Sequence, residues 1–140
     1  MSLIILKFLH YLAIVFSGGS LVGVGLINSV FTKANKVPDI NVGKVLKLLG
    51  YIGLISLIIL WLTGMLLANI IYGGFSINSA FNVKILAAAL LLILSFVVNI
   101  HMYNSSKNKT PPNKSIMKIA TMSGRGLILI VLLGAAIAFN

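Results

Sequence analysis

The first apolar stretch, residues 3–31, reads LIILKFLHYLAIVFSGGSLVGVGLINSVF and decides the fold class. It exceeds the roughly 20 mostly apolar residues that an α-helix needs to cross a bilayer. It also exceeds the apolar core of about 7–15 residues of a cleavable signal, so we expect a retained span. Similar stretches occupy residues 46–72, 83–103 and 117–139. Because lipid does not tolerate unpaired backbone groups, we expect an all-α, up-down four-helix transmembrane bundle, forming a single domain over residues 1–140.

The composition is typical of an integral membrane protein. The 140 residues are 59% hydrophobic and 9% charged, whereas soluble domains carry about 25% charged residues. The formal net charge is +10, with Asp39 as the one acid and no cysteine. The missing cysteines exclude disulfides and thiolate metal sites. The absence of acids from the spans excludes a carboxylate proton relay, a paired-carboxylate hydrolase and an acidic cation site.

Most of the positive charge lies in two of the three connections between the spans. Residues 32–44 and 104–115 carry lysines, whereas residues 73–82 carry no charge. The positive-inside rule predicts that the lysine-rich connections lie in the cytoplasm and both termini outside a cytoplasmic (inner) membrane. Anionic lipid is the expected partner of these lysines. They do not alternate with aromatic residues on one face, so we exclude nucleic acid as a partner.

The first span presents two different faces at about 100° per residue. His10, Ser17 and Asn28 share one stripe, which should face the bundle interior because polar side chains avoid lipid. Gly19 and Gly23 lie on roughly the opposite side as a GxxxG pair, which lets another backbone approach closely. We therefore expect Gly19 and Gly23 to contact another membrane subunit or a second copy of this chain.

The third span carries a second polar stripe that includes Lys84. The first and third spans run in the same direction, so Lys84 is expected near the outer surface, at a level close to His10. His101 lies roughly 15 Å deeper at 1.5 Å per residue. The two histidines are therefore not expected to ligate one haem, and His101 is expected at a helix end in contact with water.

The cations in the spans need anions that the spans lack. Lys84 lies near the membrane edge, where a lysine usually extends its ammonium group to the surface. If it is paired instead, the candidates are the C-terminal carboxylate, a lipid phosphate, a partner protein or a bound ligand such as a porphyrin carboxylate, which Lys7 could also contact. For Arg125 they are Asp39 or a lipid phosphate. His10 is compatible with three roles: axial ligand of haem b, ligand of copper or another metal, or structural histidine bonded to a backbone carbonyl or to a group on the third span.

Three segments resemble the HemJ-type protoporphyrinogen oxidases and the CopD-type copper-resistance membrane proteins. They are LKFLHYLAIVFSGGSLVGVGL at 6–26, IILWLTGMLL at 58–67 and FNVKILAAALLLIL at 81–94, with informative positions His10, Gly18, Gly19, Gly64 and Lys84. The resemblance implies that His10 is a haem axial ligand and Lys84 an essential polar partner. HemJ-type proteins carry an Arg…Asn-Glu-x-Pro motif before the last span, whereas this chain has Arg125 there without the Glu or the Pro.

Two functions remain open from the sequence. The first is a redox protein that holds one haem b through His10, with Lys84, Lys7 and Ser17 at the same site. The second is a non-catalytic accessory subunit of a larger membrane oxidoreductase or monooxygenase. Copper handling through His10 is the third, with the methionines and Trp61 interpreted as packing residues.

Overall fold

The computed structural model describes residues 2–74, 78–110 and 112–138. Its helices are α1 (Leu3–Lys33), α2 (Ile40–Tyr72), α3 (Ser79–Lys107) and α4 (Lys114–Ala138). All four are long and apolar enough to cross a membrane, and the described residues contain no strand. The prediction of an all-α bundle of four helices, each long and apolar enough to cross a membrane, is confirmed.

The helices extend beyond the apolar stretches that predicted them. α2 begins at Ile40, six residues before the predicted start at 46, because the carboxylate of the N-cap residue Asp39 accepts the backbone N–H of Val42 at 2.8 Å. Asn78 caps α3 in the same way through the N–H of Phe81. Hydropathy marks only the segment that suits lipid, whereas capping side chains set where a helix begins. The predicted end of the last span, residue 139, lies outside the described residues.

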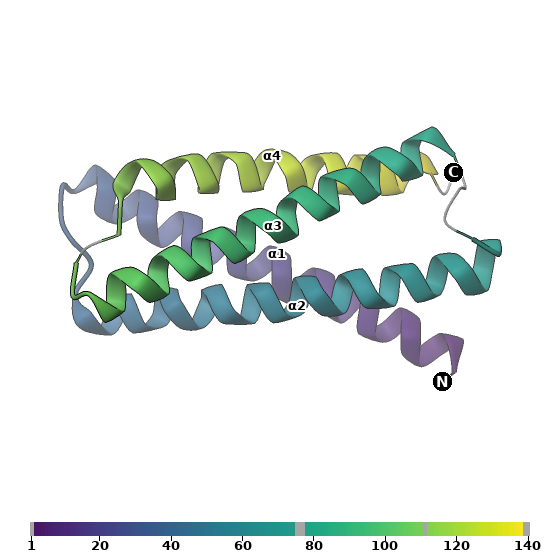
Figure 1. The fold of residues 1–140 in the computed structure, drawn as a ribbon, viewed down its shortest axis with the longest axis horizontal. Helices are drawn as coiled ribbons and strands as arrows, with labels where there is room; N and C mark the ends of the chain where they lie inside the picture. Colours follow the sequence, from purple (N-terminus) through teal and green to yellow (C-terminus); the bar gives the residue numbers. More distant parts are fainter. Residues whose placement is uncertain (1, 75–77, 111, 139–140) are drawn as a thin grey trace.

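The chain runs up and down, so its connections alternate between two ends of the bundle (Figure 1). The α1–α2 and α3–α4 connections lie at one end, which we call the basic end because it carries lysines 33, 36, 44, 47, 107, 109, 114 and 118. At the other end, which we call the open end, α1 begins, α4 finishes and α2 passes to α3. Lys7 and Lys84 belong to the open end.

The bundle consists of two helical hairpins, α1–α2 and α3–α4, with more contact within each hairpin than between them. α1 packs mainly on α2 and α3 mainly on α4, while α1 and α4 have the least contact of the four neighbouring pairs. Figure 1 shows α1 diverging from α4 toward the open end. Large apolar side chains cover the outside, for example Ile4 at 78% exposure and Ile40 at 80%, as expected where lipid is the solvent.

Candidate ligand site between the four helices

A cavity of about 460 Å³ lies between the helices in the open half of the bundle. All four helices contribute to its wall, mostly with aliphatic and aromatic side chains. The polar side chains among them belong to Lys7, His10, Tyr11, Ser17, Trp61, Tyr72 and Lys84. Ligand sites in proteins commonly measure about 300–1,000 Å³ and combine an apolar lining with a few placed polar groups, so this cavity has the form of a binding site.

His10 is held from α2 by a hydrogen bond between its Nδ1 and the hydroxyl oxygen of Thr63, at 2.9 Å. The single hydroxyl hydrogen of Thr63 is directed at the backbone carbonyls of Ile59 and Leu60, at 2.7 and 3.2 Å. With that hydrogen on a carbonyl, the hydroxyl oxygen is left to accept from His10, and we therefore assign the imidazole hydrogen to Nδ1. Nε2 then carries a free lone pair at the cavity wall, and it forms no hydrogen bond within the described part of the chain.

Gly64, the next residue on α2, provides the room for the His10 ring. A Cβ atom added to Gly64 would lie 3.2 Å from His10 Cε1 and 3.8 Å from Nδ1. A side chain at Gly64 would therefore require the imidazole ring to shift. Thr63 thus forms the hydrogen bond to His10, and Gly64 leaves the space that the His10 ring occupies. The sequence predicted, for a structural His10, a bond to a backbone carbonyl or to a group on the third span. The structure places its partners on the second span, where the Thr63 hydroxyl bonds Nδ1 beside the backbone carbonyl of Leu60.

Lys84 lines the same cavity from α3, where it is partly buried. A Cβ atom on Gly134 of α4 would lie 3.1 Å from Lys84 Cβ, so this glycine lets α4 pack directly against the base of the lysine side chain. The Lys84 ammonium lies over the ring of Phe81, 5.7 Å from its centroid. The expectation that Lys84 stands at a level close to His10 agrees with their presence in one cavity.

Lys7 and Ser17 also line the cavity, one on each side of His10 along α1. Lys7 is exposed, whereas Ser17 is buried and donates its hydroxyl hydrogen to the carbonyl oxygen of Ile14 at 3.2 Å. Ser17 therefore has only lone pairs to offer a ligand. All four residues that the sequence placed at a cofactor, His10, Lys84, Lys7 and Ser17, line one cavity.

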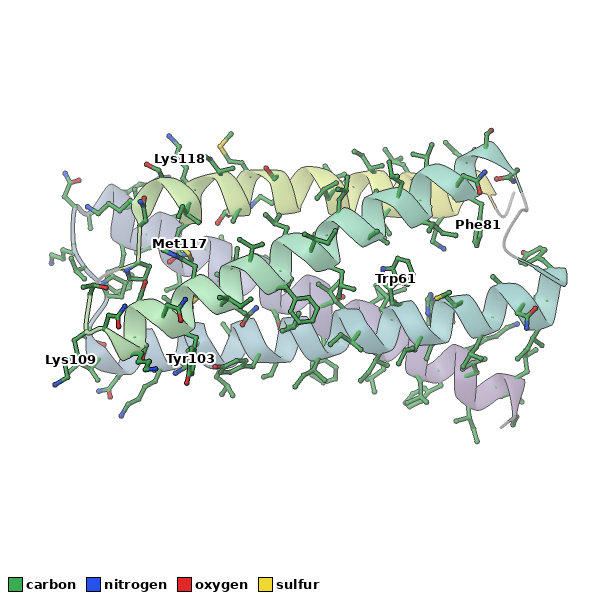
Figure 2. All side chains as sticks on the ribbon, in the orientation of Figure 1. Trp61, Phe81, Tyr103, Lys109, Met117 and Lys118 are labelled. Carbon is green, nitrogen blue, oxygen red and sulfur yellow. The ribbon has the colours of Figure 1, made fainter. Side chains whose placement is uncertain are left out.

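Trp61 is the cavity residue that sequence reasoning missed. Its indole Nε1–H is buried and has no acceptor among the described residues. Figure 2 shows the side chain directed from α2 toward α3, into the part of the bundle that contains the cavity. Buried indole N–H groups usually find an acceptor. The sequence of the span did not indicate a role at the cavity, because a tryptophan in the middle of an apolar helix usually packs against neighbouring side chains.

Gly19 and Gly23 of α1 have different surroundings in the structure. A Cβ atom on Gly23 would lie 3.4 Å from the side chain of Leu49 on α2, whereas one on Gly19 would have nothing within 4 Å. Within this chain the pair therefore does not serve a close helix–helix backbone contact. Gly19 faces open space, and its predicted contact with another subunit or a second copy stays a prediction.

His101 lies at the basic end, far along the bundle from His10. Its Nε2 accepts the backbone N–H of Asn113 at 3.0 Å, which joins α3 to the connection before α4. Asn113 in turn accepts the N–H of Ser115. The described residues contain no cluster of three or more His, Cys, Asp or Glu side chains that would hold a metal ion. A group that brings its own iron needs only one or two protein ligands, and His10 offers one.

No protein-family model, no curated protein and no solved structure matches this chain. The function therefore has to be argued from the cavity and its residues.

Proposed function

We propose that the chain is a small redox protein of the cytoplasmic membrane that holds one haem b in the cavity of the open half. The observation that carries the proposal is the hydrogen bond between His10 Nδ1 and the Thr63 hydroxyl, from which we infer a hydrogen on Nδ1 and a lone pair on Nε2. Histidines that ligate a metal commonly donate their other ring N–H to such a second group, which orients the ring.

The residues present fit such a group. The apolar wall suits a planar macrocycle, and Lys84 and Lys7 are the cations that would meet its carboxylates in a chain without acids in its helices. The Trp61 indole N–H is a further donor at the same wall. The bound iron would supply one-electron transfer, while the protein holds and orients the group and excludes water from it.

The visible spectrum of the purified protein tests this proposal. We expect a Soret band with b-type bands after reduction, present on isolation or after titration with haem, and lost in His10→Ala. The matched control is His101→Ala, which removes the other histidine at the basic end and should keep the spectrum. A folded protein that stays colourless after haem titration would reject the proposal.

The orientation is part of the proposal. The positive-inside rule assigns the basic end to the cytoplasm and both termini to the outside. Because the chain has no cysteine, single Ser2→Cys and Lys36→Cys variants can be labelled in intact cells with a membrane-impermeant thiol reagent. Labelling of Ser2→Cys alone is expected, and labelling of Lys36→Cys alone would reverse the orientation.

A second candidate function is a non-catalytic subunit of a larger membrane oxidoreductase or monooxygenase. The open space beside Gly19 favours it, because small residues on a lipid-facing surface let another helix approach. Purification from native membranes in mild detergent tests it. Co-purifying subunits that are lost in Gly19→Leu support this function, and migration of the wild-type chain alone contradicts it. Copper handling has less support, because His10 is the one imidazole at the cavity.

A further inference from the structure

A second polar feature lies in the other half of the bundle, around Arg125. This residue lies near the middle of α4, seven residues beyond Lys118 in an otherwise apolar segment. Its guanidinium group lies against Gly25 of α1, where an added Cβ atom would be 2.7 Å from Nη2. Within the described ranges it forms no hydrogen bond or ion pair. A guanidinium group has five N–H donors, so an arginine in a membrane span requires an acceptor.

The chain does not supply that acceptor from an acidic side chain. Its one acid, Asp39, has its carboxylate engaged at the start of α2, where it accepts the N–H of Val42. The expectation that Asp39 is a candidate partner of Arg125 therefore finds no support in the structure. The anion has to come from outside the chain.

Arg125 belongs to a row of cations that begins at the membrane surface. At 100° per residue, Lys114, Lys118 and Arg125 fall within about 40° on one face of α4, and all three are exposed. Thr121 lies on the same face, and its methyl group would be 3.3 Å from a Cβ on Gly25, so this face borders α1. The row therefore runs along the seam between α1 and α4, the least-packed neighbouring pair.

α1 contributes another donor near this seam. Asn28 lies one helical turn from Gly25 toward the basic end, and its Nδ2 is buried without an acceptor among the residues described. The Lys118, Asn28 and Arg125 side chains thus all offer hydrogens, while the hydroxyl of Thr121 on the same face of α4 donates to the carbonyl of Met117. The arrangement is suited to a group that carries several acceptor oxygens and negative charge.

We propose that the α1–α4 seam is a binding site for an anionic phospholipid of the leaflet at the basic end, whose headgroup phosphate is bound by Arg125 with Lys118. Arg125 lies about 10 Å deeper in the membrane than Lys118. The long arginine side chain extends toward the surface, and local thinning of the bilayer brings the headgroup toward Arg125, so that together they cover this distance. The planar guanidinium group matches two phosphate oxygens at once. Gly25 leaves the space that the guanidinium group occupies, so a side chain there would shift Nη2 from this position.

The charge pattern favours a lipid over a free anion or an acidic partner protein. The lysines of the basic end concentrate anionic lipid at the surface, and the row on α4 continues from that surface into the seam. Basic sites between membrane helices on the lysine-rich side commonly bind phospholipid headgroups. A free phosphate would leave the apolar part of the seam uncovered.

Lipid binding to the delipidated full-length chain in detergent tests this site, with phosphatidylglycerol, phosphatidylcholine and inorganic phosphate as the three probes in native mass spectrometry. We expect phosphatidylglycerol to bind more tightly than phosphatidylcholine, and inorganic phosphate neither to bind nor to compete. Arg125→Gln should weaken phosphatidylglycerol binding roughly 10- to 100-fold. Lys44→Gln removes the same charge at the basic end outside the α4 row, and should weaken it at most about fivefold.

Two further variants separate position from charge. Gly25→Ala leaves the net charge unchanged, but it displaces the guanidinium group and should weaken phosphatidylglycerol binding beyond the effect of Lys44→Gln. If Gly25→Ala does not fold, Arg125→Lys gives the same test, because it keeps the charge and loses the planar fork.

Three results would overturn the proposal. Equal losses in Arg125→Gln and Lys44→Gln would indicate general surface attraction. Competition by inorganic phosphate would indicate a free-anion site. Release of a co-purifying membrane protein by Arg125→Gln, with lipid binding unchanged, would assign the arginine to an acidic residue of another subunit.

Discussion

The two halves of the bundle use glycine for different purposes. In the basic half, glycines face side chains of neighbouring helices at contact distance: a Cβ on Gly53 would be 3.2 Å from Ser20 Cβ, and one on Gly124 would be 3.2 Å from Leu21. In the open half, Gly64 and Gly134 instead make room for the two polar side chains at the cavity, His10 and Lys84. Glycine therefore allows close packing at Gly53 and Gly124, and it makes room for a polar side chain at Gly64 and Gly134 in the open half and at Gly25 in the basic half.

The divergence of α1 from α4 explains the difference. Toward the basic end α1 and α4 approach each other, with side-chain contacts at Gly25 and Gly124, and the separation of the helices toward the open end leaves the cavity. Stability should therefore depend mainly on the basic half and ligand binding on the open half. Three predictions test this division, from the largest expected effect to the smallest.

The first prediction concerns the basic half. Gly53→Val should lower the free energy of unfolding by about 1–3 kcal/mol, because the new side chain overlaps the buried Ser20 of α1. Denaturant unfolding in detergent measures it. Gly43→Val is the matched control on the same helix, because a Cβ there meets nothing within 4 Å. Equal destabilisation by both variants would show that the loss does not come from the contact with Ser20.

The second prediction concerns the bond that holds His10. Thr63→Val removes the acceptor for Nδ1–H while keeping the shape of the side chain, so haem affinity should fall about 10- to 100-fold. The free energy of unfolding should change by only about 0.6 kcal/mol, a typical value for one polar contact in a membrane protein. Thr63→Ser keeps the hydroxyl and should keep the affinity. Full haem binding by Thr63→Val would refute the orienting role of this bond.

The third prediction concerns the indole N–H that lacks an acceptor. If Trp61 donates to the ligand, Trp61→Phe should weaken haem binding about 2- to 10-fold, the effect of one lost neutral hydrogen bond. Without ligand, the variant should be nearly as stable as the wild type, because the phenylalanine leaves a small void but removes an unpaired buried donor. Isothermal titration with haem and unfolding of the ligand-free protein measure the two effects. Unchanged affinity would place Trp61 outside the binding site.

The candidate site was predictable in part. His10 and Lys84 stood out because polar residues are rare and costly in apolar spans, and the matching directions of the first and third spans placed them at one level. Thr63, Gly134 and Trp61 gave no comparable signal. Their roles depend on which helix faces which, and in a span where every face is apolar the sequence pattern does not fix helix rotation.

The sequence by itself determined the class of protein, the number of spans and the separation of the two histidines. Each follows from chain length and hydropathy, since lipid demands about 20 apolar residues per helix and helical rise fixes depth. The tertiary structure alone decided the tautomer of His10, the cavity around it and the position of Arg125 against Gly25. These depend on contacts between distant residues, His10 with Thr63 and Gly25 with Arg125, which arise only when the helices pack with one particular rotation and crossing.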